Sequence, residues 1–222
     1  VDGLDEARLD ELLAAGRLPN IQKRFVDGGV HVENAVAAVP AMTYPNSVSL
    51  FTGCFPGHHG VLGNQVFDRV RLTWIDYITL HCHTHRGVTH SFDNMLETGP
   101  AWYIGLHIPV NQYVASCLEQ IAAMAERVRK WPVLTTFYFP GLDAAGHAQG
   151  SQSDYYAQVL EDVDHQIGRV TNAMESAGLL DSSYLALVTD HGHPRSDKAE
   201  SFDLIDWLKK ERKIRCHHGP VP

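Results

Sequence analysis

The spacing of apolar residues predicts alternating helices and strands along most of the chain. Leucines three and four positions apart share one face of a short amphipathic helix over Glu6 to Ala15, which ends at Gly16. A second helix is predicted from Pro19 to Gly28-Gly29, and an apolar run from Val30 to Val39 follows it.

The clearest helix in the sequence spans about Asp154 to Glu175. A second helix is predicted from Val114 to about residue 129, and the apolar runs Val133–Phe139 and Tyr184–Thr189 are typical of buried strands. Helices and strands that alternate in this order predict a parallel sheet with crossover helices. The stripe on the clearest helix consists of Tyr156, Val159, Leu160, Val163, Ile167, Val170 and Met174.

Length and composition indicate one large domain. The chain has 222 residues, of which 44% are hydrophobic, and this is enough to bury a sizeable core. The stretch from Val66 to Pro109 shows no clear period and contains a Gly99-Pro100 break. We therefore predict a single domain over residues 1–222, in which residues 66–110 form an insertion or cap over the site.

The charge balance argues against a nucleic-acid surface. The formal net charge is −8, with 26 acidic residues against 18 basic ones, whereas phosphate backbones are bound by dense lysine and arginine. Any phosphate group that this chain binds is therefore expected to be held by metal ions. No run of 18 apolar residues occurs, so the sequence predicts no membrane span in this segment.

Two carboxylate and imidazole pairs follow the two predicted strands. Asp143 and His147 come after the first apolar run, and Asp190-His191 comes directly after the second. Both pairs are expected at the carboxyl edge of one sheet, where open α/β sheets bind ligands. Oxygen and imidazole donors that converge there suit divalent ions, with Zn²⁺ favoured by the mixed ligands and Mn²⁺ as the second candidate. Two pairs predict two ions.

Thr43 is placed where a helix is predicted to begin. Pro45 suits the first turn of that helix and Gly53 its end. The backbone N–H groups and the dipole at a helix N-terminus favour an anion such as a phosphoryl group. A metal ion could activate the Thr43 hydroxyl as a nucleophile, although a helix-capping role is commoner for a threonine in this place.

Four separated motifs together resemble the alkaline phosphatase superfamily, and within it the nucleotide pyrophosphatase/phosphodiesterase branch. They are Val1-Asp2-Gly3; Thr43-Tyr44-Pro45-Asn46 with the following segment to Gly63-Asn64; Asp143-x-x-x-His147; and Thr189-Asp190-His191-Gly192. The motifs cover both ends of the chain in the family's order. The resemblance implies a three-layer α/β/α sandwich with a mainly parallel central sheet.

The resemblance also implies roles for individual residues. Asp2, Thr43, Asp190 and His191 would surround one ion, with Thr43 both a ligand and the nucleophile that forms a phospho-threonine intermediate. Asp143 and His147 would bind the second ion together with a histidine that the family supplies late in the chain. Asn64 matches a family asparagine that hydrogen-bonds a phosphoryl oxygen. Two dications, a helix N-terminus and an amide donor can neutralise a phosphoryl group without a basic patch.

The late histidine is the main departure from the family pattern. Only His217 and His218 follow late enough, and His218 is preferred because a glycine follows it, although an exposed tail explains both histidines equally well. The spacing leads us to expect truncation at one or both ends or missing internal residues, and the chain also lacks an initiator methionine. His193 stands where the family often has methionine, and we interpret it as a second-shell or surface residue rather than a pocket residue.

The predicted function is metal-dependent hydrolysis of phosphodiester or pyrophosphate bonds in nucleotides or similar small phosphate esters. A phosphomonoesterase and a phosphonoacetate-type phosphonate hydrolase are the alternatives within the class, because they share the threonine and the ligand set. A sulfatase is disfavoured, because Cys54-Phe55-Pro56-Gly57-His58 lacks the arginine of the cysteine motif that sulfatases require. A noncatalytic metal-binding relative is the alternative from another class. The sequence predicts no oligomeric state.

Overall fold

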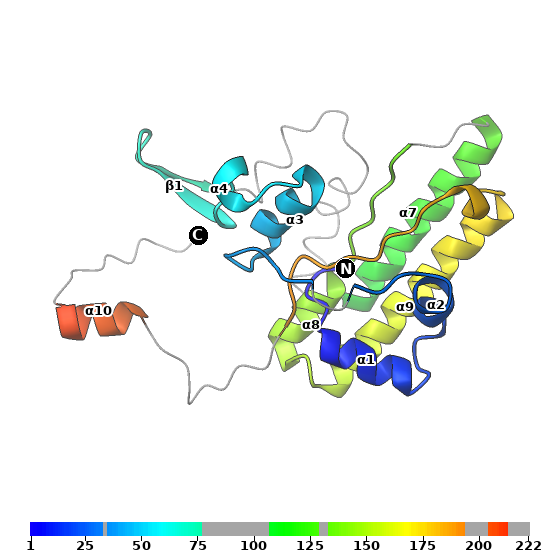
Figure 1. Ribbon diagram of the computed structural model, residues 1–222, viewed down its shortest axis with the longest axis horizontal. Coiled ribbons are helices and arrows are strands. Elements are labelled where there is room, and N and C mark those ends of the chain that lie inside the picture. The colour runs from blue at the N-terminus through cyan, green and yellow to red at the C-terminus, as the bar shows by residue number, and fades with distance from the viewer. Residues whose placement is uncertain (33–34, 77–106, 129–132, 194–203, 213–222) are drawn as a thin grey trace.

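A computed structural model describes residues 1–32, 35–76, 107–128, 133–193 and 204–212. Helix α9 (Asp154–Ser176) lies at the centre of the main core, and α7 (His107–Val128) and α8 (Gly141–Gln149) pack against it (Figure 1). The predicted apolar stripe of α9 is buried along its whole length. Both long helices of the sequence analysis are therefore confirmed, and α7 begins earlier than its stripe indicated.

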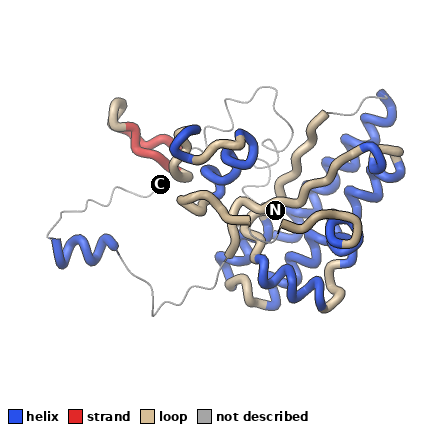
Figure 2. Tube along the Cα trace, viewed as in Figure 1, coloured by secondary structure: helices blue, strands red, loops and turns tan. Residues whose placement is uncertain are grey.

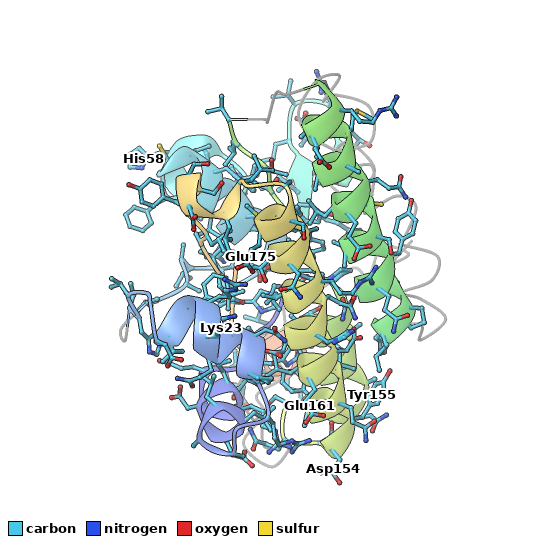
Figure 3. All side chains as sticks on the ribbon, turned by 90° about the vertical axis from the view of Figure 1, so that its right-hand side faces the viewer. Lys23, His58, Asp154, Tyr155, Glu161 and Glu175 are labelled. Atoms are coloured by element: carbon cyan, nitrogen blue, oxygen red, sulfur yellow. The ribbon has the colours of Figure 1, made fainter. Side chains whose placement is uncertain are left out.

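The amino-terminal helices cover another side of α9. They are α1 (Glu6–Ala14), α2 (Pro19–Ile21) and the π-helical turn η1 (Gln22–Val26). Two ion pairs join this segment to α9. Arg17 pairs with Glu161 at a nitrogen–oxygen distance of 2.6 Å, and Arg24 pairs with Glu175 at 2.7 Å. Figure 3 shows both glutamates along α9. The first predicted helix is confirmed, and the second is divided between α2 and η1.

A second group of elements follows, drawn in cyan in Figure 1: α3 (Thr43–Thr52), α4 (Pro56–His59) and the strands β1 (Gln65–Asp68) and β2 (Thr73–Asp76). The helix predicted to begin near Thr43 is confirmed, and Gly53 ends it in the left-handed conformation with φ of 67°. The strands β1 and β2 pair antiparallel as a hairpin (Figure 2). His59 of α4 is connected to α3 by a hydrogen bond between its ring Nε2 and the Ser49 hydroxyl, at 3.0 Å.

The strands predicted at 133–139 and 184–189 are not strands in the structure. Both runs are extended, but in the described part of the chain the only paired strands are β1 and β2. A strand needs a neighbouring backbone along its length. The backbone contacts of these runs include Val1 N donating to Val188 O and Asp2 N donating to Phe139 O, both near the carboxyl ends. The side chain of Val133 accordingly stays fully exposed. The parallel sheet of the predicted sandwich is therefore not confirmed.

Several sequence predictions fall outside the described residues. Most of the expected cap, residues 77–106, lies there, and so do both candidate late histidines, His217 and His218. The short helix α10 (Leu204–Arg212) is described between two such segments. Among the helices that the structure describes, none combines the length and the apolar character that crossing a bilayer requires.

Candidate metal centre

Three aspartates from distant parts of the chain meet where the two extended runs end. Asp2 comes from the chain start, Asp143 from the first turn of α8, and Asp190 from the end of the second run, and their exposed fractions are only 4%, 6% and 7%. Gly3 lets the backbone turn against Asp143: its φ is 65°, and a Cβ there would lie 2.8 Å from Asp143 Oδ1. Gly3 N also donates to Asp190 Oδ1 at 3.3 Å, which joins the three segments.

The imidazole of His191 lies among these three carboxylates. Its Nε2 atom is 3.6 Å from Asp2 Oδ1, 3.8 Å from Asp190 Oδ2 and 4.0 Å from Asp143 Oδ1. The ligand atoms of Asp2, Asp143 and His191 all lie within 4.8 Å of one another. Carboxylate oxygens and an imidazole nitrogen at such separations can converge on one divalent ion.

The electrostatics of the cluster favour a cation. Burial, together with the charges of Asp190 and Asp143, raises the pKa of Asp2 well above its ordinary value, although the Tyr138 hydroxyl donates to Asp2 Oδ2 and partly offsets this. One buried oxygen of each aspartate has no hydrogen-bond partner, and in the described part of the chain no lysine or arginine pairs with them. Unpartnered buried carboxylate oxygens are costly unless a cation binds them, so the residues present fit a divalent ion.

Thr43 stands at the first position of α3, beside the cluster. Its Oγ1 atom is 3.4 Å from His191 Nε2, so the hydroxyl and the N-terminus of α3 both lie next to the carboxylates. Met42 takes the N-cap position and makes no side-chain cap bond, so Thr43 is not the helix cap that the alternative interpretation required. The Thr43 side chain therefore lies beside the carboxylates without capping α3.

Two asparagines support this end of α3. Asn46 is buried and binds the preceding loop, because it accepts from Ala38 N at 2.7 Å and donates to the carbonyls of Pro40 and Met42 at 3.0 Å. Asn64 accepts from Tyr44 N at 3.2 Å, which places it next to the first turn. The family resemblance selects Asn64 but assigns no role to Asn46, although the place of Asn46 after Pro45 in the first helical turn is a usable signal.

A second group of possible ligands shares Asp143 with the first. It consists of Asp143, His147 and His193, whose ligand atoms also lie within 4.8 Å of one another. His147 follows Asp143 by one turn of α8, with Nε2 at 3.5 Å from Asp143 Oδ2. Burial lowers the pKa of His193 and so favours the neutral imidazole, the form that ligates metals. This position differs from the expectation that His193 supports the ligands from behind or lies on the surface.

The chain matches a family profile described as type I phosphodiesterase / nucleotide pyrophosphatase over residues 1–104 and 83–220. The chain belongs to this family. Membership confirms the resemblance to the nucleotide pyrophosphatase/phosphodiesterase branch of the alkaline phosphatase superfamily, and it implies an α/β fold. The two matched stretches overlap at residues 83–104, within the segment expected to form the cap.

Individual relatives carry names from the same family. Ectonucleotide pyrophosphatase/phosphodiesterase family member 1 from Rattus norvegicus is 24% identical over 98% of this chain, and family member 5 from Homo sapiens is 25% identical over 87%. Bis(5'-adenosyl)-triphosphatase enpp4 from Mus musculus is 24% identical over 92%. The chain spans 26%, 44% and 49% of these three relatives' own lengths, so it corresponds to about a quarter to a half of each.

Proposed function

We propose that the chain is a two-metal hydrolase that cleaves phosphodiester or pyrophosphate bonds in nucleotides or similar small phosphate esters, through a phospho-threonine intermediate on Thr43. The observation that carries this proposal is the position of Thr43 Oγ1, 3.4 Å from His191 Nε2 and at the N-terminus of α3. A hydroxyl beside a cluster of buried, unpartnered carboxylate oxygens is placed where a metal ion held by those oxygens would activate it for attack on phosphorus.

Two sets of residues would hold the metal ions. Asp2, Thr43, Asp190 and His191 form the proposed first site, and Asp143 and His147 belong to the second. Mixed carboxylate and imidazole donors favour Zn²⁺, and Mn²⁺ is the second candidate. When bound, two such ions supply positive charge to the attacking and leaving oxygens of an in-line displacement.

The chain's own residues would position the reacting group. The backbone N–H groups and dipole of α3 favour an anion beside Thr43, where the phosphoryl group must lie for attack. Asn64 uses its carbonyl oxygen on Tyr44 N, so its NH₂ group is the end that can donate to a phosphoryl oxygen. Thr43 Oγ1 would release its proton to solvent and form a bond to phosphorus as the bond to the leaving group breaks, and the leaving group would take up a proton and depart. Water would then hydrolyse the phospho-threonine, releasing the phosphate product and restoring the Thr43 hydroxyl.

The names of the relatives support a nucleotide substrate. They include nucleotide pyrophosphatase/phosphodiesterases and a bis(5'-adenosyl)-triphosphatase, whose reactions cleave phosphodiester or pyrophosphate links. The overall negative charge of this chain fits an anionic substrate only if metal ions offset the repulsion. We therefore infer a small nucleotide or phosphate ester rather than a polymeric nucleic acid.

A comparison of substrates and Thr43 variants tests the proposal. The metal-replete full chain is expected to hydrolyse bis-p-nitrophenyl phosphate faster than p-nitrophenyl phosphate or phosphonoacetate. Replacing Thr43→Ala is expected to lower the rate at least about 1,000-fold, because the nucleophile is lost, whereas Thr43→Ser keeps a hydroxyl and measurable activity. Metal content measured on each variant controls for loss of the ions.

Three outcomes would contradict parts of the proposal. Full activity in Thr43→Ala would exclude the phospho-threonine mechanism. Faster hydrolysis of p-nitrophenyl phosphate or of phosphonoacetate would assign the chain to one of the alternative hydrolases. No hydrolysis of any substrate by the metal-replete protein would leave a noncatalytic metal-binding relative.

A further inference from the structure

We propose that His193 supplies the third protein ligand of the second metal site, together with Asp143 and His147. The second site would then be complete within α8 and the segment that follows Asp190, and it would need neither His217 nor His218. This inference rests on the proposed metal-dependent function, and it gives His193 a direct role in place of the expected supporting or surface position.

The spacing of the three side chains is that of ligands around one ion. His193 Nε2 lies 3.2 Å from Asp143 Oδ1, and His147 Nε2 lies 3.5 Å from Asp143 Oδ2. Metal bonds of about 2.0–2.1 Å in tetrahedral geometry separate neighbouring ligand atoms by roughly 3.3 Å. Both measured distances agree with that separation.

Two polar atoms of this group make no hydrogen bond, although they lie only 3.2 Å apart. Asp143 Oδ1 and His193 Nε2 are buried atoms with no hydrogen-bond partner, and the Asp143 side chain is only 8% exposed. The rings of His147 and His193 meet edge to face with centroids 4.7 Å apart, so both imidazoles lie on the same side of α8. A shared ion would satisfy the unpartnered carboxylate oxygen and the unpartnered ring nitrogen together.

Two further contacts place the His193 ring in this position. The ring packs against Gly146, where a Cβ would lie 2.6 Å from His193 Cδ2, so only glycine leaves room for it. Ser151, which is buried, donates from its hydroxyl to His193 O at 2.6 Å and anchors the backbone. Because neither contact involves the rest of the metal cluster, they hold His193 beside Asp143 and His147 independently of an ion.

Metal titration of the chelator-treated full chain tests the inference. Zn²⁺ added in competition with a chromophoric chelator is expected to reveal two bound ions in the wild-type protein. His193→Ala should lower the affinity for one of these ions at least about 100-fold, and so should His147→Ala. Losing even a group that orients a ligand typically costs 10- to 100-fold in metal affinity. The matched control is His165→Ala, which removes an exposed histidine from α9.

A second variant separates ligation from general loss of structure. Gly146→Ala keeps every proposed ligand and favours the helix, but its Cβ must displace the His193 ring. This variant should bind the same ion less tightly and change the visible absorption of the Co²⁺-substituted second site. Thermal unfolding of the metal-free protein is the control for folding. The double variant His217→Ala/His218→Ala should keep both ions.

The outcomes distinguish this inference from the proposed function. If the His193→Ala protein still binds two ions tightly, the role of His193 is overturned, whereas the proposed two-metal hydrolase is unaffected. Loss of the second ion in the His217/His218 double variant but not in His193→Ala would also overturn it. No bound ion in the wild-type protein would overturn both proposals.

Discussion

At the scale of single residues, the Tyr156 hydroxyl holds the backbone beside the metal centre. It donates to Gly3 O at 2.7 Å and accepts from Asp5 N at 2.9 Å, and the side chain is fully buried on α9. Burial raises the pKa of this phenol, which therefore stays protonated and can keep donating. One hydroxyl thus connects the central helix to the turn that carries Asp2.

Replacing Tyr156→Phe should lower the free energy of unfolding by about 1–3 kcal/mol, because two buried backbone groups lose their partner. It should also weaken metal binding, since the Gly3 turn positions Asp2. Urea unfolding and Zn²⁺ titration would measure the two effects. Tyr184→Phe is the matched control, because the Tyr184 side chain is fully exposed; equal losses in both variants would contradict the prediction.

The buried charge of Asp2 predicts a pH dependence in the metal-free protein. Because the pKa of Asp2 is raised in the folded state, the folded protein holds a proton that the unfolded chain has released. Asp2 therefore contributes stability at low pH, and this contribution is lost as pH rises from about 4 through the raised pKa.

Asp2→Asn should remove that contribution to the pH dependence and stabilise the metal-free protein at pH 7. The same variant should lose the stabilisation that Zn²⁺ gives to the wild type. Urea unfolding at several pH values, measured once with a chelator and once with Zn²⁺, checks both results. Asp10→Asn is the control, because Asp10 is an exposed aspartate on α1. A less stable metal-free Asp2→Asn protein would show that the carboxylate is not strained by burial.

At the scale of elements, α9 organises its neighbours through a carboxylate as well as through its apolar stripe. Asp164 is buried and accepts hydrogen bonds from Ile21 N at 2.7 Å and from the Asn20 amide at 2.8 Å, at the start of α2. On another side, Arg169 binds Glu119 of α7 through two nitrogens at 2.9 and 2.7 Å. The central helix therefore carries polar attachments to both neighbouring elements.

Asp164→Ala should destabilise the protein by about 1–3 kcal/mol, because the N–H groups at the start of α2 lose their buried acceptor. The local consequence should be faster amide exchange in α2 and η1 than in α7. Hydrogen exchange together with urea unfolding would measure this, with Asp10→Ala as the exposed control. Uniform acceleration over all helices would contradict a local role.

At the scale of the whole molecule, the sequence predicted what depends on local pattern. The stripe of α9 and the start of α3 at Thr43 follow from periodicity and from helix-end signals, and these are confirmed. The runs 133–139 and 184–189 have the composition of strands, but pairing depends on distant backbone that composition does not specify. The position of His193 could not be predicted for a similar reason, because Gly146 and Ser151 place it through contacts that no spacing reveals.

The contact between Gly3 and Asp190 joins positions 187 residues apart, whereas α7, α8 and α9 follow one another closely along the chain. Contacts of such long range form slowly, because the chain must first close a very large loop. During refolding, helical circular dichroism should therefore recover before the protein gains its capacity to bind Zn²⁺. Stopped-flow measurements that follow both signals should show metal capture as the later event.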